Sequence, residues 1–479
     1  MKCKDCSGGD FGYRLEDGKP YCNAEKRIGI NELEEFHCLR GTISISGLQN
    51  VKSSHDALEA RIRLQNVKSS HDALEAKISE KRHLERLALK WYSTTEDSQN
   101  ARDLEVINCP KLIGHLPTKV LSLVVGIEIV DCPKIVASLL MSTSTRKLVL
   151  NECQGVQLEG QSVPSVEKLE ISGFERLKEF ASELVILTNL KELMVEKCPR
   201  LYEELSEEMS HCYTSLERLD VSYCERLKSL PLGLFPKLRS VQIWHCTNFE
   251  TLLIPDGIEL QNLTLLESLS IGDCINMFSL PCGGLPAPNL SFLLVDCCEK
   301  LEALPEQMHA LLPSLQSLVL HNCPKIESFP EGGLPSKLGA LDIRNCKKLV
   351  GGRRDWGLQT LPSLISFSMF DKSRDVLESF PEEGLLPPTL TFFSFGRLLN
   401  LKSLNKRGLQ RLGSLDSMLI FDCPQLQSLP KEELPNSLFE LQICDCPLLK
   451  PRCRREEGED WHKIAHISFI KIDGEVISE

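Results

Sequence analysis

The sequence has few aromatic residues and no long apolar segment, and both features narrow the class of protein. Aromatics make up 6% of its 479 residues, against 42% hydrophobic residues in all, so the core must be mainly aliphatic. The most apolar run, Val120–Val130, is about half a membrane span and contains Glu128. The first residues, MKCKDCSGGDFGYRLEDG, lack the apolar core of a signal peptide. We therefore expect a cytoplasmic protein without a transmembrane segment.

Basic residues are too few for a nucleic-acid-binding protein. The chain carries 55 Lys and Arg against 67 Asp and Glu, a net charge of −12. Binding to phosphates needs concentrated positive charge, whereas an acidic surface suits protein partners. We expect protein partners and no nucleic acid.

No pattern of catalytic or nucleotide-binding residues stands out. There is no Ser-His-Asp, metal or paired-carboxylate constellation above background, and no G-x-x-x-x-G-K-[ST] loop to hold phosphates. Cys3, Cys6, Cys22 and Cys38 could bind zinc, but their spacing differs from that of common zinc ribbons. We predict a non-enzymatic protein without cofactor or metal. ADP or ATP would matter only if the full-length product contains a nucleotide-binding domain.

What the sequence has in abundance is one repeated pattern, L-x-x-L-x-I-x-x-C-x-x-L, from Ala101 to Leu449. One unit reads Leu216, Leu219, Val221, Cys224 and Leu227. The fourth and sixth residues alternate with polar ones, which predicts a short strand with these two side chains inward. About fifteen such units over residues 99–450 predict an α/β repeat solenoid. This would be a leucine-rich-repeat horseshoe, with a parallel β-sheet on the concave face and mostly irregular or short helical returns.

The repeat accounts for most of the 21 cysteines, because twelve of them occupy its ninth position. These are Cys109, Cys132, Cys153, Cys198, Cys224, Cys246, Cys274, Cys298, Cys323, Cys346, Cys423 and Cys446. The three other units carry Phe174, Lys372 and Leu398 there. A small side chain that can form hydrogen bonds suits this turn inside the stack. We therefore predict a structural column rather than redox or metal chemistry.

Three segments lie outside the regular repeats. Residues 1–25 are unassigned and expected to be disordered. Residues 26–98 form an irregular N-terminal segment in which LQNVKSSHDALEA occurs identically at 48–60 and 64–76, with a helix expected from about Ser70 to Leu84. Residues 451–479 read as a closing segment that covers the last repeat. Its apolar residues are Trp461, Ile464, Ile467 and Phe469.

The third, fifth, seventh and eighth positions of each unit should face outward from the sheet, and some of them are unusually apolar. The candidate concave-face partner contacts are Tyr223, Trp244, His245, Phe292, Leu294, Phe370, Phe392, Leu419 and Phe421. Clustered exposed apolar residues mark protein interfaces, although return loops could instead cover some of these. Many units carry an acid or amide just before the ninth position, either as a solvated rim or as a contact for a basic ligand. These are Asp131, Asp273, Asp371, Asp422, Asp445, Asn108, Asn322 and Asn345.

Four stretches resemble the leucine-rich-repeat region of plant coiled-coil nucleotide-binding leucine-rich-repeat (NLR) disease-resistance proteins. They are GTISISGLQNV at 41–51, HLERLALKW at 83–91, the L-x-I-x-x-C-P-x-L units and GEDWHKIAHISFIKID at 458–473. Complete members of that family add a coiled coil and a nucleotide-binding switch. Because no phosphate loop is present, the chain resembles a repeat region that lacks the nucleotide-binding domain.

The resemblance implies a defence module that recognises a pathogen effector or a host protein, or that restrains a nucleotide-binding switch. Alternatives are a repeat-only adaptor, a substrate-recognition scaffold of a ubiquitin ligase, or a non-functional truncated remnant. A ligase scaffold would need an adaptor-binding domain before the repeats, and residues 1–40 do not resemble one.

Overall fold

The computed structural model divides the chain into two compact units. Unit 1 comprises Met1–Leu227 and Leu234–Pro236, and unit 2 comprises Lys228–Gly233 and Lys237–Glu479. The structure describes residues 11–16, 19–22, 41–46, 84–90, 103–107, 126–131, 136–138, 145–152, 155–157, 165–174, 188–199, 214–254, 263–281, 283–372, 377–430 and 434–477. The duplicated stretch, the expected helix from Ser70, and Cys3, Cys6 and Cys38 lie outside these residues.

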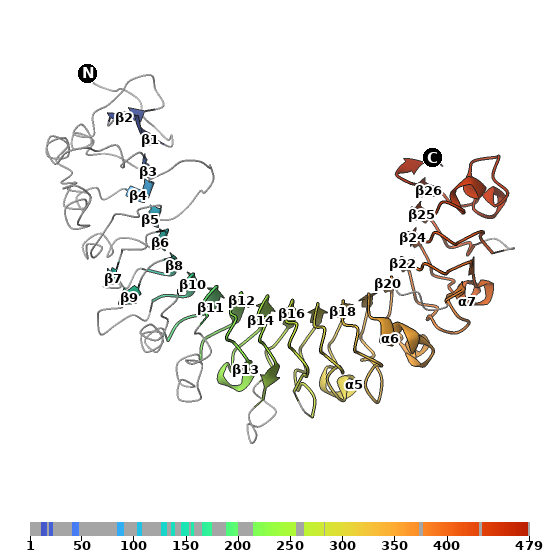
Figure 1. Cartoon of the computed structure of the whole chain (residues 1–479), viewed down its shortest axis with the longest axis horizontal. Helices are drawn as coiled ribbons and strands as arrows, with labels where there is room; N and C mark the ends of the chain where they lie inside the picture. The colour runs from blue at the N-terminus through green and yellow to red at the C-terminus, as the bar shows by residue number, and fades with distance from the viewer. Residues whose placement is uncertain are drawn as a thin grey trace. The chain divides into compact units, whose positions relative to one another are not determined.

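Unit 1 is built on a parallel ladder of short strands (Figure 1). In chain order its strands are β1 (Phe11–Glu16), β2 (Lys19–Cys22), β3 (Gly41–Ser46), β4 (Leu84–Lys90), β5 (Asp103–Ile107), β6 (Gly126–Val130), β8 (Lys147–Asn151), β10 (Lys168–Ser172), β11 (Glu192–Glu196) and β12 (Arg218–Ser222). Parallel pairing runs from β1 through β3, β4, β5, β6, β8, β10 and β11 to β12. A second pair, β7 (Val136–Ser138) and β9 (Gly155–Gln157), belongs to the returns.

Within residues 1–25, the structure describes two strands. Strands β1 and β2 form an antiparallel hairpin in which Glu16 pairs with Lys19. The two residues between the strands in the sequence are Asp17 and Gly18, a pair typical of two-residue hairpins. The alternation of Phe11, Tyr13 and Leu15 with other residues was the second signal for a strand.

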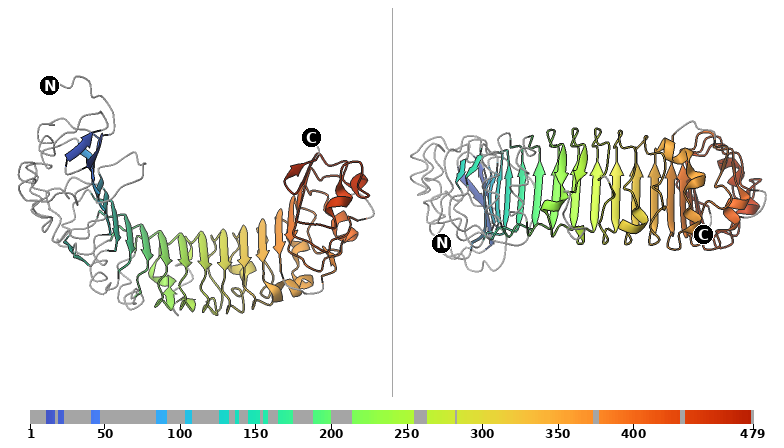
Figure 2. Two further views of the ribbon diagram at one scale, coloured as in Figure 1. Left: turned by 45° about the horizontal axis from the view of Figure 1, so that its top comes forward. Right: turned by 90° about the horizontal axis from the view of Figure 1, so that it is seen from below.

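Unit 2 repeats the same arrangement with ten main strands in the described part of the chain, which lie side by side and point in one direction (Figure 2). They are β14 (Ser240–Trp244), β16 (Ser268–Gly272), β17 (Phe292–Asp296), β18 (Ser317–His321), β19 (Ala340–Arg344), β20 (Ser366–Phe370), β22 (Phe392–Gly396), β24 (Ser417–Phe421), β25 (Glu440–Cys444) and β26 (Phe469–Ile472). Consecutive members pair in parallel without a shift in register. Strand β27 (Glu475–Val476) adds antiparallel to β26.

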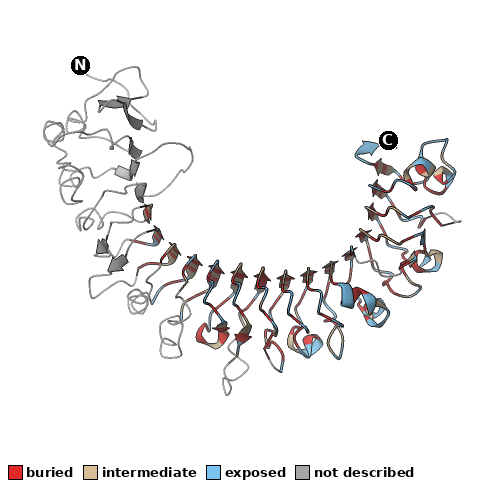
Figure 3. Ribbon diagram, in the orientation of Figure 1, coloured by how far each residue is buried: buried red, intermediate tan, exposed pale blue. Residues whose placement is uncertain are grey.

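Where the structure describes them, the returns contain little regular structure, and buried and exposed residues are mixed along them (Figure 3). The short strands are β13 (Ser229–Pro231), β15 (Thr251–Leu253), β21 (Ser379–Phe380) and β23 (Ser403–Leu404). The helices are α5 (Met308–Leu311), α6 (Lys347–Gly351) and α7 (Lys406–Gln410), with 3₁₀ turns η6 (Leu232–Leu234), η8 (Arg353–Asp355), η9 (Leu358–Thr360), η10 (Lys450–Cys453) and η11 (Trp461–Lys463). The predicted fold, a parallel-sheet solenoid with irregular or short helical returns, is confirmed.

The core consists of the inward-facing residues of the strands and the leucines of the returns. In β17, for example, Leu293 and Val295 are fully buried while their neighbours are partly exposed. One repeat cannot cover these side chains alone, since the next repeat supplies the other wall of the core. Stability is therefore cooperative between neighbouring repeats.

Among the described residues, the one that follows a main strand usually adopts a left-handed backbone conformation. Asp273, Asn322, Asn345, Asp422 and Asp445 have φ between 49° and 54°. In the first four the backbone N–H donates to the carbonyl of the next strand, as Asn322 does to Arg344 at 2.7 Å. Asn and Asp tolerate this conformation better than other non-glycine residues. Backbone geometry is therefore sufficient reason for an acid or amide at these five positions. Asp371 is an exception, because it is buried and its φ is not positive.

The cysteine column lies directly after this turn. All nine of its described members are buried, and each thiol donates to the carbonyl of the residue two positions earlier. The donors are Cys198, Cys224, Cys246, Cys274, Cys298, Cys323, Cys346, Cys423 and Cys446, at 3.0–3.5 Å. Cys346 also reaches the carbonyl of Leu320 in the preceding repeat at 3.5 Å. Cys109, Cys132 and Cys153 lie outside the described residues.

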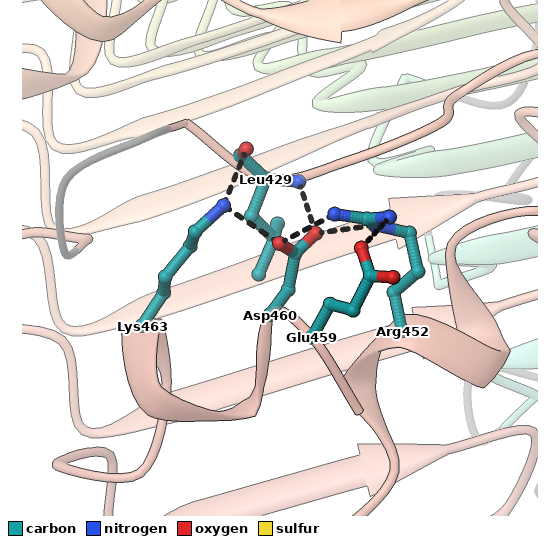
Figure 4. Close-up of polar contacts among 5 residues, drawn as sticks. All are labelled: Leu429, Arg452, Glu459, Asp460 and Lys463. Atoms are coloured by element: carbon teal, nitrogen blue, oxygen red, sulfur yellow. Dashed lines mark hydrogen bonds and ion pairs between the residues drawn. The ribbon is translucent and has the colours of Figure 1, made fainter. Parts of the chain in front are cut away.

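In the closing segment, the buried carboxylate of Asp460 binds backbone groups of an earlier return (Figure 4). Asp460 accepts the backbone N–H of Leu429 at 3.0 Å, and the Lys463 ammonium donates to the carbonyl of the same leucine at 3.2 Å. Arg452 and Lys463 donate to the two Asp460 oxygens at 2.6–3.1 Å. The two side chains thus pair the backbone groups that a further repeat would pair.

At the edge of the sheet, the Asp473 carboxylate also binds a backbone N–H, as Asp460 does in the returns. The Asp473 carboxylate accepts the backbone N–H of Asp445 at 2.8 Å and pairs with Lys450 at 2.6 Å. Of the predicted covering residues, Ile464 and Ile467 are buried, whereas Trp461 and Phe469 are partly exposed.

Candidate protein-binding surface

The sheet face of unit 2 carries the solvent-facing positions of each strand. Within the unit, the strands lie on the inner side of the curve and the returns on the outer side (Figure 1). The parallel register places the first, third and fifth residues of successive strands in three rows across this face. Eight of the nine candidate contacts lie in unit 2, and Tyr223 lies in unit 1.

Two phenylalanines meet over a glycine in the row of fifth residues. Phe370 on β20 and Phe421 on β24 have ring centroids 6.5 Å apart, and Gly396 of β22 lies between them. A Cβ on Gly396 would lie 2.3 Å from the Phe421 carbonyl oxygen and 3.0 Å from Phe370 Cδ1. Only glycine at this position lets the two rings close over the middle strand.

Guanidinium groups flank the two rings. Arg344 lies 5.1 Å from the centroid of Phe370, and Arg397 lies 5.9 Å from that of Phe421. Both distances are within the range of cation–π attraction. The Arg344–Phe370–Phe421–Arg397 row is thus ordered by contacts within the chain.

Arg344 also belongs to an ion-pair cluster with Asp342 and His321. Its Nη2 is 2.8 Å from Asp342 Oδ2, and His321 Nε2 is 3.3 Å from the same oxygen. Burial raises the pKa of Asp342, but interactions with His321 and Arg344 outweigh it, so the pKa lies below its ordinary value. The carboxylate fixes the direction of the guanidinium.

A second aromatic residue lies over a glycine at the start of the unit. Trp244 at the end of β14 covers Gly272 of β16, where a Cβ would lie 2.1 Å from Trp244 Cζ3. His245 follows in the left-handed turn, and its Nδ1 lies 3.3 Å from Asp273 Oδ2. These two aromatics lie at the carboxyl-terminal edge of the strands.

The remaining candidates lie in the rows of first and third residues. Phe292 and Leu294 are half-buried on β17, and Leu294 is in register with Val319 of β18. Phe392 begins β22 and is 36% exposed, and Leu419 is half-buried in the middle of β24.

Sequence reasoning missed two exposed residues at the opposite edge. Ile365 and Phe439 precede β20 and β25 and are 51% and 56% exposed. They occupy the second position of the unit, which the outward-facing pattern did not include. The sequence did contain a signal for them, because the second position of the unit is mostly polar in the other repeats.

Unit 1 has a different sheet face. Lys168 pairs with Glu170 and Glu192, and Arg218 pairs with Asp220, at 2.9–3.3 Å. Tyr223 lies in the left-handed turn after β12, is 46% exposed, and has the Lys197 ammonium 5.9 Å from its ring centroid. Its surroundings are charged rather than apolar.

Chemical sites other than a binding face are not evident where the structure is described. No group of three or more His, Cys, Asp or Glu side chains there could hold a metal ion. In the same residues, no helix has the length and hydropathy needed to span a membrane.

The strand pairings, the buried aliphatic rows and the short returns define a leucine-rich-repeat protein. Residues 61–198 match the family model described as R13L1/DRL21 LRRs. The disease resistance protein At3g14460 of Arabidopsis thaliana is 40% identical over 319 residues, which are 66% of this chain and 22% of that protein. TMV resistance protein N of Nicotiana glutinosa is 28% identical over 171 residues, covering 35% of this chain and 14% of that protein.

Solved structures with a similar arrangement include a circular leucine-rich-repeat protein, CroV588, with a TM-score of 0.48 and 14% identity over 76% of this chain and 56% of the other. YopM from Yersinia enterocolitica gives a TM-score of 0.40 and 19% identity over 77% and 84%. Because both scores lie below 0.5, the fold assignment rests on the strand pairings of this chain.

Fold and relatives together support a leucine-rich-repeat region like those of plant disease-resistance proteins, in agreement with the resemblance seen in the sequence. The chain spans about a fifth of the length of the Arabidopsis relative. Family and fold are those of protein-interaction modules.

Proposed function

We propose that this chain is the recognition module of a plant intracellular immune receptor, and that unit 2 binds a pathogen effector or a host protein on its sheet face. The observation that carries the proposal is the fixed aromatic row in which Phe370 and Phe421 close over Gly396 between Arg344 and Arg397. Through the rest of the receptor, such binding would release a restrained nucleotide-binding switch.

The composition of the row supports this proposal. Aromatic residues and arginine dominate the energetics of protein interfaces, because they bury large areas at a low cost in conformational entropy. Here the rings and guanidinium groups are already ordered by each other and by Asp342. A partner would therefore meet a preorganised surface.

The buried thiols support a reducing compartment, the cytoplasm. Nine column cysteines use their Sγ–H to bind backbone carbonyls inside the solenoid. Oxidising conditions would favour disulfides instead.

The test is a double substitution on the sheet face, Phe292→Glu with Phe421→Glu. We expect the double variant to lose the proteins that the wild type captures from extracts of pathogen-challenged leaves, because two charges would be buried at the interface. Both residues are partly exposed, so the midpoint of thermal unfolding should change little.

The matched control is Phe278→Glu, since Phe278 is 50% exposed and lies in a return of the same unit. This variant should capture the same proteins as the wild type. Capture that survives the double substitution but fails with Phe278→Glu would place the binding surface on the returns.

A further inference from the structure

A distinct surface runs along the edge of the unit 2 sheet where the strands begin, from β20 to β26. We call it the acidic-apolar edge. It consists of the residue before each strand and the first residue of the strand: Ile365, Ser366, Thr391, Phe392, Asp416, Ser417, Phe439, Glu440, Ser468 and Phe469. The first residues are in direct register across the five strands.

Exposed apolar side chains are concentrated along this edge. Ile365, Phe392 and Phe439 are 51%, 36% and 56% exposed, and Phe469 is partly exposed. Neighbouring strands lie about 4.8 Å apart, so the first three fall within roughly 15 Å. Backbone bonds fix the spacing, since Phe392 donates to the Ile365 carbonyl at 2.9 Å. Large apolar groups held this close together are typical of a binding surface.

The two carboxylates among them have no cation. Asp416 is exposed, and Glu440 accepts only from the neutral donors Ser417 Oγ at 3.0 Å and Gln442 Nε2 at 2.7 Å. Neither forms an ion pair within the part of the chain that the structure describes. The edge itself contains no Lys or Arg.

Equivalent positions in other repeats behave differently. Glu267, which also precedes its strand, pairs with Arg239, and Glu167 in unit 1 pairs with Lys191 at 2.9 Å. Asp416 and Glu440 therefore differ from these two glutamates in having no paired cation among the described residues. A net negative, apolar surface is complementary to a partner that brings the positive charge.

We propose that the acidic-apolar edge docks a partner segment that presents Lys or Arg beside large apolar side chains. The apolar side chains of that segment cover Ile365, Phe392 and Phe439, and its cations pair with Asp416 and Glu440. This inference rests on the proposed function and adds the chemistry of the partner.

The experiment uses a displayed library of random peptides, panned against the full chain. The wild type should enrich peptides that combine Lys or Arg with large apolar residues. The variant with Asp416→Lys and Glu440→Lys should bind these peptides at least about tenfold more weakly, and synthetic versions with Glu in place of Lys and Arg should bind this variant better than the wild type.

Two controls show whether a loss of peptide binding is due to the acidic-apolar edge. Glu299→Lys with Glu306→Lys reverses two exposed charges on the returns of unit 2 and should leave binding unchanged. Thermal unfolding of each variant checks that the chain is folded.

The outcomes also separate this inference from the proposed function. An absence of enriched peptides, or enriched peptides without Lys or Arg, contradicts the inference. The peptides could bind the variant with Asp416→Lys and Glu440→Lys but not the variant with Phe292→Glu and Phe421→Glu. That result would agree with the proposed function and contradict the role of this edge. If leaf-protein capture is insensitive to every sheet-face variant, the proposed function itself fails.

Discussion

At the scale of single residues, the cysteine thiols act as short polar links between strand and return. A thiol is small enough for the buried turn, and its hydrogen bond satisfies a carbonyl that would otherwise face an apolar core. Burial raises the pKa of Cys198 to about 11 and that of Cys298 to about 12. These thiols are therefore protonated and unreactive at neutral pH.

Alkylation kinetics test this description of the thiols. At pH 8 in the native protein, Cys198 and Cys298 should react with iodoacetamide at least about a hundredfold more slowly than in urea, because both access and the thiolate fraction are reduced. Mass spectrometry of the digested protein measures each site separately. Equal rates in native and unfolded protein would contradict a structural column.

Residue identity predicted the column but not the glycine–aromatic contacts. The ninth-position cysteines recur at one place in the repeat, so their common position in the turn could be read from the sequence. Gly396 shows its importance only beside Phe370 and Phe421, which come from two other repeats. Contacts of this kind depend on register between strands, which a single unit does not encode.

At the scale of elements, the backbone N–H and C=O groups of each repeat bond to those of the next repeat. In the closing segment, side chains take the place of the next repeat's backbone. Asp460 and Lys463 meet the return ladder at Leu429, while Asp473 meets the sheet at Asp445. The apolar residues of this segment were predictable from the sequence. The carboxylate pairing was not, because it depends on Asp460 being folded back against a return 31 positions earlier in the chain.

Asp460→Asn should lower the free energy of unfolding by about 3 kcal/mol at pH 7, since it leaves the buried Lys463 without its counter-charge and Arg452 with only the exposed Glu459. Denaturant unfolding measures the difference. Asp355→Asn, at an exposed aspartate of the same unit, is the control and should change the free energy little.

The pH dependence of this difference has a definite sign. Burial raises the pKa of Asp460, but hydrogen bonds from Arg452, Lys463 and the Leu429 N–H outweigh it and hold the pKa below its ordinary value of 3.8. The carboxylate therefore stabilises the fold above that value and ceases to do so as the pH falls through the folded pKa. The gap between wild type and Asp460→Asn should shrink below about pH 4; a gap that widens with acid would contradict this assignment.

At the scale of the whole molecule, the two units share one backbone plan and differ in the chemistry of their sheet faces. Where its side chains are described, the face of unit 1 carries ion pairs such as Lys168–Glu192, while that of unit 2 carries aromatic rows and unpaired carboxylates. The solenoid and the aromatic candidates followed from the repeat pattern. The contrast between the faces required the strand register and the ion pairs of the folded chain.

The central claim, that the sheet face of unit 2 binds a protein, is tested most directly by site-specific photocrosslinking. A photoreactive phenylalanine analogue is placed at Phe392 on the sheet face or at Phe278 on the returns, both of which are exposed. On irradiation in pathogen-challenged leaf tissue, we expect a discrete crosslinked protein from position 392 and none from position 278. Crosslinking confined to position 278 would contradict the claim.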